Sequence, residues 1–324
     1  MGGNPVRALR VALVAVVCGL VCALVVGLPG CSSGPPAFDK PPVRVVCTTT
    51  MVADMVKGIG GDRVTVDTLM GPGIDPHRYQ PIAGDRQKIE GAHLVFFNGL
   101  HLEGKMTDTF EKSRGRIRGY AVTDGIDKAQ LRHAEVDGGE HDPHVWFDVM
   151  LWSKCVGTVK DALTALDPAG KDVYQKNADA YLKELEALDK EIRVELARVS
   201  PQENRVLVTS HDAFGYFGRA YGFDVKGLQG VSTASESGTR DVKELVDFLG
   251  KNKIPAVFTE TSVPEAGLKT VLDACKRDHG HTVQLVGGKD ALYSDALGAP
   301  GTSGETYAGM IRHNVKVIVT ALSK

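Results

Sequence analysis

Four residues of types that commonly bind metal ions are spread along the chain: His77, His144, His211 and Asp295. They occur in the stretches GPGIDPHRY, HDPHVWFDV, VTSHDAFGYF and LYSDALG. Three imidazoles and one carboxylate form a nitrogen and oxygen donor set that suits zinc or manganese, with iron as a third candidate. More than two hundred residues separate the first from the last, so only a folded architecture can bring them together. The set therefore predicts a site between lobes, unlike a zinc finger contained in one short stretch.

The chain alternates between strand-like and helix-like segments. Apolar runs predict two sets of four strands, at 43–47, 64–70, 93–97 and 119–122, and at 205–210, 223–228, 256–260 and 281–286. Helix-length segments separate or follow them, near 50–60, 82–92, 103–114, 150–166, 212–221, 239–251, 265–279 and 303–323. This alternation is typical of parallel sheets covered on both faces. The predicted fold class is therefore α/β, with two doubly wound parallel-sheet lobes.

The four candidate ligands follow predicted strands of both lobes. In open α/β sheets, ligands bind in the crevice beyond the carboxyl ends of the strands. His77 follows strand 64–70, and His144 lies in the loop ahead of the helical segment at 150–166. His211 comes directly after strand 205–210, and Asp295 follows strand 281–286. We therefore expect two ligands from each lobe at a shared rim, where the proline of each DPH tripeptide restrains the backbone ahead of the histidine.

One long helix is predicted between the lobes, over 167–199. Asp167 and Pro168 supply an N-cap and a proline at the first helical position. Apolar residues then recur at steps of three and four: Tyr174, Ala178, Tyr181, Leu185, Leu188, Ile192 and Leu196. Some thirty residues at ~1.5 Å each would span ~45 Å. Because bending a continuous helix breaks backbone hydrogen bonds, we expect a rigid strut between a lobe at 43–166 and a lobe at 200–324.

The first thirty residues have the features of a bacterial lipoprotein signal peptide. Arg7 and Arg10 precede the apolar run VALVAVVCGLVCALVVG, and LPGC follows it. This resembles a lipobox cut before Cys31, the expected lipidation site, although Pro29 replaces the usual small residue. An uncleaved membrane span is the alternative. In either case residues 31–42 are predicted to form a flexible tether, and the body faces the periplasm or the cell exterior, anchored to the envelope.

Charge and cysteine usage exclude other classes. Without residues 1–30 the 38 Lys and Arg fall to 36, because Arg7 and Arg10 are lost, against 40 Asp and Glu, a net charge of −4. This balance lacks the concentrated basic footprint of nucleic-acid binders. Cys47, Cys155 and Cys275 have no close spacing, which argues against a disulfide framework and against thiolate zinc. We expect three buried thiols.

Several motifs in order resemble the metal-specific solute-binding lipoproteins of bacterial ABC transporters, periplasmic solute-binding protein family 9. They are CTTTMVADMVKGIGGDRV, LMGPGIDPHRYQP, NGLHLEGKM, DPHVWFD, SHDAFGYFGRAYG, STASESG and YSDALG, and the resemblance runs from about residue 43 to the C-terminus. It implies a monomeric, non-enzymatic protein that delivers zinc or manganese to an ABC permease with a cytoplasmic ATPase. The metal-ligand positions of the family fall on His77, His144, His211 and Asp295.

The sequence leaves open which carboxylate is the oxygen ligand and which metal ion is bound. Asp290 and Glu260 compete with Asp295 as the oxygen ligand, although Glu260 fits better behind a ligand, as an orienting group. Glu236, in STASESG, is expected to be a buried carboxylate that is structural or orients a ligand. A third imidazole favours zinc, whereas the chain lacks the long histidine-rich loop of some zinc-uptake members of the family. The sequence favours capture of both zinc and manganese.

Two other functions could use the same residues. A secreted metal-dependent hydrolase could place an activated water on a three-histidine centre. The chain has no HExxH, however, and no candidate general base lies next to a ligand in sequence. A surface adhesin with a structural metal is the second alternative. Metal binding at equilibrium without turnover, together with loss of metal uptake on deletion, would separate the three.

Overall fold

The computed structural model describes Gly34 and residues 36–106, 110, 117–136, 139–201 and 204–323. Residues Pro35–Lys324 form one compact unit. The predicted signal peptide and the lipidation residue Cys31 lie outside the described residues. Within the described ranges, no helix has the length and apolar character needed to cross a membrane.

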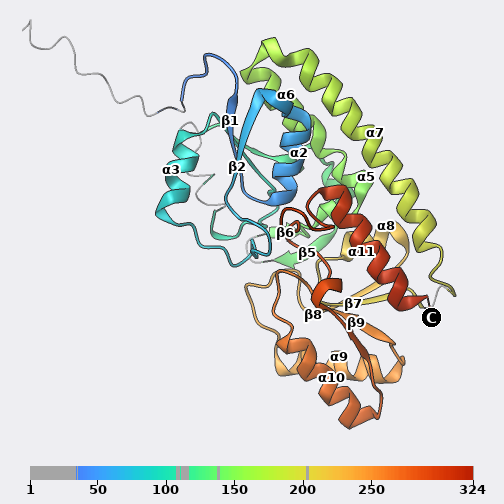
Figure 1. Ribbon diagram of the computed structural model, residues 1–324. Coiled ribbons are helices and arrows are strands. Elements are labelled where there is room, and N and C mark those ends of the chain that lie inside the picture. The colour runs from blue at the N-terminus through green and yellow to red at the C-terminus, as the bar shows by residue number, and fades with distance from the viewer. Residues whose placement is uncertain are drawn as a thin grey trace, which may run out of the picture. The chain divides into compact units, whose positions relative to one another are not determined.

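Two four-stranded parallel sheets form the framework (Figure 1). The first contains β1 (Val43–Cys47), β2 (Val64–Thr68), β3 (Leu94–Phe97) and β4 (Gly119–Ala121), in the order β2-β1-β3-β4. The second contains β7 (Val206–His211), β8 (Asp224–Gln229), β9 (Ala256–Phe258) and β10 (Gln284–Val286), in the order β10-β9-β7-β8. The strand order reverses between β1 and β3 and between β7 and β9, and such switch points are where doubly wound sheets bind ligands. The predicted α/β class with two lobes is confirmed.

Helices cover these sheets close to the predicted positions. The N-terminal lobe has α2 (Thr50–Gly60), α3 (Ala83–Gly91), α5 (Val149–Trp152) and α6 (Cys155–Leu166). The C-terminal lobe has α8 (Gly215–Tyr221), α9 (Thr239–Lys251), α10 (Ala266–His279) and α11 (Tyr307–Leu322). The segment predicted as one helix at 150–166 is two helices, and much of the helix predicted at 103–114 falls outside the described residues.

An antiparallel hairpin was not predicted. It consists of β5 (His133–Val136) and β6 (Gly139–His141), and it stands directly before the DPH tripeptide of His144. Its strands are short and mostly polar, so they lack the apolar run by which the other strands were recognised. His144 therefore leaves a hairpin and does not come directly from the fourth strand of the sheet.

The long helix α7 covers Lys171–Leu196, shorter at both ends than predicted. Asp167 does not cap it: a 3-10 turn, Pro168–Gly170, comes first, and the Asp167 carboxylate accepts from Arg63 at 2.8 and 2.9 Å. The buried stripe of α7 packs against α2, α5 and α6 of the N-terminal lobe and against α11 (Figure 1). The helix thus contacts elements of both halves of the chain, as a strut would, while the predicted lobe boundaries stay a prediction.

The apolar core is continuous between the lobes. One cluster of buried side chains includes Val45 of β1, Leu188 of α7, Phe217 of α8, Phe258 of β9 and Ile318 of α11. A second cluster lies between the C-terminal sheet and helices α9 and α10. Interiors of this kind are close-packed and resist deformation. The shared cluster therefore works against wide separation of the lobes.

Residues just ahead of β1 contact the N-terminal lobe. Phe38 packs edge-on against His93, with ring centroids 5.4 Å apart, and Arg118 donates to the Pro36 carbonyl at 2.9 Å. Pro36 and Phe38 thus contact the folded body, Phe38 by covering an apolar surface, while the flexible tether at 31–42 stays a prediction. Cys47, Cys155 and Cys275 are free and buried, as predicted.

Candidate metal site

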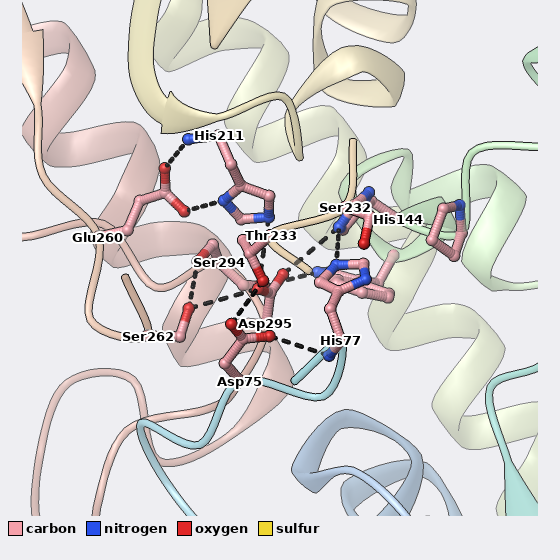
Figure 2. Close-up of polar contacts among 12 residues, drawn as sticks. Asp75, His77, His144, His211, Ser232, Thr233, Glu260, Ser262, Ser294 and Asp295 are labelled. Atoms are coloured by element: carbon pink, nitrogen blue, oxygen red, sulfur yellow. Dashed lines mark hydrogen bonds and ion pairs between the residues drawn. The ribbon is translucent and has the colours of Figure 1, made fainter. Parts of the chain in front are cut away.

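His77, His144, His211 and Asp295 converge in the structure (Figure 2). All four side chains are buried, and one candidate ligand atom from each lies within 4.8 Å of the others. Nε2 of His77 is 3.2 Å from Nε2 of His144. The Asp295 carboxylate is 3.5 Å from Nε2 of His144 and 3.3 Å from Nε2 of His211. Four donors therefore face one point.

Three of the four residues reach this point from the carboxyl end of a parallel sheet, and His144 reaches it from the hairpin. His211 is the last residue of β7, and His77 lies in the loop that follows β2. His144 follows hairpin strand β6, and Asp295 lies in the loop after β10. The loop of Asp295 is fixed by a parallel bridge between Leu292 and Glu260. The two lobes contribute two residues each.

Two buried carboxylates hold two of the histidines from behind. Glu260 accepts from the backbone N–H of His211 at 2.9 Å and contacts the Nδ1 of its ring at 2.6 Å (Figure 2). Asp142 does the same for His144, at 3.0 Å from the backbone nitrogen and 2.8 Å from Nδ1. A carboxylate on Nδ1 keeps the proton there, so that the lone pair of Nε2 is available to a metal ion. Both rings thus present Nε2 to the centre.

Two polar atoms at the centre are buried without a hydrogen bond. They are Nε2 of His211 and Oδ1 of Asp295, which find no hydrogen-bond partner among the described residues. Leaving a buried polar group unpaired costs about 1–3 kcal/mol, so such atoms are rare unless a ligand completes them. A metal ion bound between them would satisfy both.

Charge in the site is balanced between imidazoles and carboxylates. Burial lowers the pKa of His77 to about 3, against the opposing effect of Asp295. Burial also disfavours charge on His211, but Glu260 and Asp295 outweigh it and raise the pKa of His211 well above its usual value. Burial raises the pKa of Asp295, but His211 and His144 outweigh it and hold that pKa well below the usual range. The carboxylates therefore stabilise positive charge here, which a dication also supplies.

Neighbouring loops close the site. Ser262 donates to Asp295 at 3.4 Å and shares a 2.7 Å hydrogen bond with Ser294. Asp75 accepts from the His77 backbone at 2.9 Å, and Thr233 of the C-terminal lobe donates to the other oxygen of Asp75 at 2.5 Å. The hydrogen bond between Thr233 and Asp75 joins a loop of each lobe beside the candidate ligands.

The other predicted residues lie in different places. Glu260 stands behind His211, where an orienting group was expected. Asp290 is exposed in a 3-10 turn and does not join the cluster. Glu236 is exposed and lines a groove beside β8 and α9 of about 770 Å³. The expectation that Glu236 is buried is therefore wrong, because its side chain faces this open groove.

Asp142 is the residue that the sequence prediction missed. The DPH tripeptide drew attention to its proline and histidine, while its aspartate was given no role. A signal was present: an acidic residue stands two positions before the histidine in both DPH tripeptides. In both, that aspartate accepts from the backbone N–H of the histidine.

The arrangement can bind one divalent transition-metal ion. Three imidazole nitrogens and one carboxylate give the four donors that a tetrahedral ion such as zinc takes in closed sites. Because all four donors come from the protein, no position is reserved for an activated water. The geometry favours binding over hydrolysis.

Comparison with known proteins gives consistent matches. The model of the family described as ZnuA, zinc-uptake complex component A, periplasmic, matches residues 45–321. The manganese-binding lipoprotein MntA of Bacillus subtilis is 46% identical over 298 residues, which cover 91% of this chain and 95% of MntA. The zinc-binding protein TroA of Treponema pallidum is also 46% identical, over 288 residues that cover 89% of this chain and 91% of TroA.

Solved structures agree with these sequence matches. The structure of the periplasmic zinc-binding protein TroA superimposes with a TM-score of 0.82, covering 88% of this chain and 100% of that one. An Fe(III)-bound structure of YtgA from Chlamydia trachomatis, at 28% identity, has a TM-score of 0.76 and covers 86% of this chain and 98% of that one.

Proposed function

The chain belongs to the family of periplasmic zinc-uptake components, and from this premise we propose that it captures zinc or manganese outside the cytoplasm and delivers it to an ABC permease. The membership confirms the family resemblance indicated by the motifs. The metal ion is the cargo of this protein: it is bound, carried and released without chemical change.

The convergence of four buried donors carries the proposal. His77, His144, His211 and Asp295 come from four separate segments and both lobes, and a shared metal ligand accounts for the convergence of all four side chains. The unpaired Nε2 of His211 and Oδ1 of Asp295 support the same conclusion. We therefore propose these four residues as the metal ligands, with Glu260 and Asp142 holding two of the imidazoles.

The identity of the cargo is zinc, manganese or both. Relatives at the same 46% identity are named for manganese in one case and for zinc in the other, so identity does not separate the two. Iron is a third candidate, since a structural relative is Fe(III)-bound. Three imidazoles favour zinc in raw affinity, because manganese binds most nitrogen and oxygen sites more weakly. We propose that zinc binds more tightly and that manganese binds well enough to be carried.

A metal-competition titration tests this function. Protein lacking residues 1–30 would be stripped with a chelator and titrated with zinc and with manganese by calorimetry, with bound metal counted by mass spectrometry. The proposal requires about one ion per chain and no hydrolysis of model esters, peptides or phosphates. Metal-dependent turnover would favour a hydrolase, and tight binding with normal metal uptake in a deletion strain would favour an adhesin.

The predicted signal peptide at residues 1–30 bears on where the protein is located. We propose that the mature protein is a monomer tied to the envelope by lipid on Cys31 and that its partners are a permease and a cytoplasmic ATPase. The features that support this are the lipobox-like LPGC of the sequence and the lipoprotein relative MntA. Growth with labelled palmitate should mark the wild-type protein and not Cys31→Ala; a wild-type protein without label would contradict lipidation.

A further inference from the structure

A strained turn lies beneath the N-terminal half of the site. It belongs to the motif NGLHLEGKM, which has no part in the ligand set. Gly99, Leu100 and His101 follow one another with φ of 88°, 53° and 61°. Leu100 and His101 carry side chains, and left-handed backbone costs such residues energy that surrounding contacts must offset. Three consecutive residues of this kind require a local cause.

Glu103 supplies that cause. Its carboxylate is fully buried and accepts from three groups: the Thr48 hydroxyl at 2.8 Å, the Asn98 N–H at 2.6 Å and the Gly99 N–H at 3.3 Å. The last two are the backbone groups that lead into the left-handed turn. A carboxylate that receives backbone N–H groups in this way fixes the path of the chain. Burial raises the pKa of Glu103, and the hydrogen bond from Thr48 and those from backbone N–H groups oppose this effect.

The same group stands at the switch point of the N-terminal sheet. Thr48 directly follows β1, and Asn98 directly follows β3. Doubly wound sheets place ligands beyond the strand ends at this point. Here Glu103 is bound to the first residue beyond each strand, so it fixes the two strand ends relative to each other.

The residues on either side of the turn, Asn98 and Gly104, contact both ligand loops of the lobe. The Asn98 side chain donates to the carbonyl of Pro143, the residue before His144, at 3.1 Å. Gly104 lies so close to His77 that a Cβ there would be 3.1 Å from the His77 carbonyl oxygen. Met70, where the loop to His77 begins, donates to the Thr48 carbonyl at 3.0 Å. Glu103 is thus one contact away from each of these supports.

We infer that Glu103 is a positioning residue for metal capture: it holds the left-handed turn at 99–101 that supports His77 and His144 from beneath. This inference rests on the proposed function and names a residue that acts on the same site. Glu103 touches neither histidine, so its effect on the metal is carried by the turn, by Asn98 and by Gly104.

The test uses Glu103→Gln and Co²⁺ as a spectroscopic probe. A glutamine oxygen can keep the contacts with Thr48 and Asn98, but its NH₂ group then faces the Gly99 N–H, donor against donor. We expect zinc affinity to fall about tenfold, the size typical of lost support behind a ligand. The visible absorption of bound Co²⁺ should also change, because its intensity follows the coordination geometry.

A matched control separates positioning from stability. Asp167 is also a buried carboxylate, 3% exposed, and it is held by Arg63 and Tyr174 beside α7, away from the ligands. Asp167→Asn should lower the melting temperature and leave zinc affinity and the Co²⁺ spectrum unchanged. If Glu103→Gln behaves in the same way, Glu103 is only a structural residue and the inference is overturned.

Rescue by glycine tests the turn itself. Glycine adopts positive φ without strain, so adding His101→Gly to Glu103→Gln should restore most of the lost affinity and the Co²⁺ spectrum. An affinity loss that His101→Gly leaves unchanged would overturn the role of the turn. If Glu103→Gln does not fold, Thr48→Val removes one donor to Glu103, and wild-type affinity in that variant would count against the inference. A wild-type protein that binds neither Zn²⁺ nor Co²⁺ would instead refute the proposed function, and the inference with it.

Discussion

Glu260→Gln is the most informative single change to the site. Glu260 contacts His211 twice, at the backbone N–H and at Nδ1 of the ring. Glutamine has one oxygen and one NH₂ group in place of two oxygens. If its oxygen faces the backbone N–H, its NH₂ donates to Nδ1, which moves the ring proton to Nε2 and blocks the metal-binding lone pair. If it turns over, the NH₂ opposes the backbone N–H. Neither orientation of the glutamine amide reproduces the two contacts that Glu260 makes with His211.

The size of the loss follows from these contacts. Outer carboxylates that orient a ligand histidine contribute about 10–100-fold to metal affinity. That range is about 1.4 to 2.8 kcal/mol. We expect the upper part of it, because Glu260 is 5% exposed and its 2.6 Å contact with the ring is short. The loss should appear as a raised apparent dissociation constant, since the tautomer without the Nε2 lone pair cannot bind the ion.

Competition against a chromophoric chelator measures the effect for zinc and for manganese. Glu236→Gln is the control, since it makes the same chemical change on an exposed side chain and should leave affinity within about twofold. Circular dichroism with and without chelator checks that both variants fold. A Glu260→Gln protein with wild-type zinc affinity would refute the claim that this carboxylate sets the tautomer of His211.

Four further outcomes are expected. His211→Ala removes a nitrogen donor and should weaken zinc binding at least tenfold, or about 1.4 kcal/mol, by calorimetry. Asp295→Asn keeps an oxygen but loses the charge that offsets the dication, so metal retention through gel filtration should fall while circular dichroism is unchanged. The raised pKa of His211 and of His144 means that protons compete for both, so affinity should fall as the pH drops from about 7 to about 5. Because the pKa of His77 is about 3, proton uptake measured in two buffers should approach about two per ion released and stay below three; affinity independent of pH would contradict a histidine site. Small-angle scattering with and without zinc should give nearly equal radii of gyration, and a change of several ångströms would refute a stiff connection between the lobes.

The strands could be predicted because their signal is local. Runs such as VRVVC at 43–47 and VLVTS at 206–210 are apolar enough to mark strands buried on both faces. The ends of these strands then indicated where ligands should stand, and the structure brings His77, His144, His211 and Asp295 together. The chemistry of the site could be predicted from the sequence as well, because few residue types bind metal ions and residues of these types follow the predicted strands.

Contacts set by tertiary packing could not be predicted in this way. Asp142 has chemistry similar in sequence to that of the exposed Glu236 and Asp290, and only the path of each loop decides which carboxylate meets an imidazole. The positive φ of Leu100 and His101 was equally hidden. Asn98-Gly99 indicates a turn, but a leucine with positive φ is uncommon, so the sequence does not show that the left-handed backbone continues through Leu100 and His101.

The three imidazoles are held unequally, and this bears on release. His144 and His211 each have a carboxylate on Nδ1, whereas the His77 ring, within the described part of the chain, contacts the rings of the other two histidines instead. His77 is fixed mainly through its backbone, by Asp75 and by the closeness of Gly104. The core shared through α7 and α11 opposes a wide opening of the lobes. We therefore expect a change small enough to leave that core intact to free His77 first, while His144 and His211 stay in place; metal dissociation that Asp75→Asn does not accelerate would contradict this.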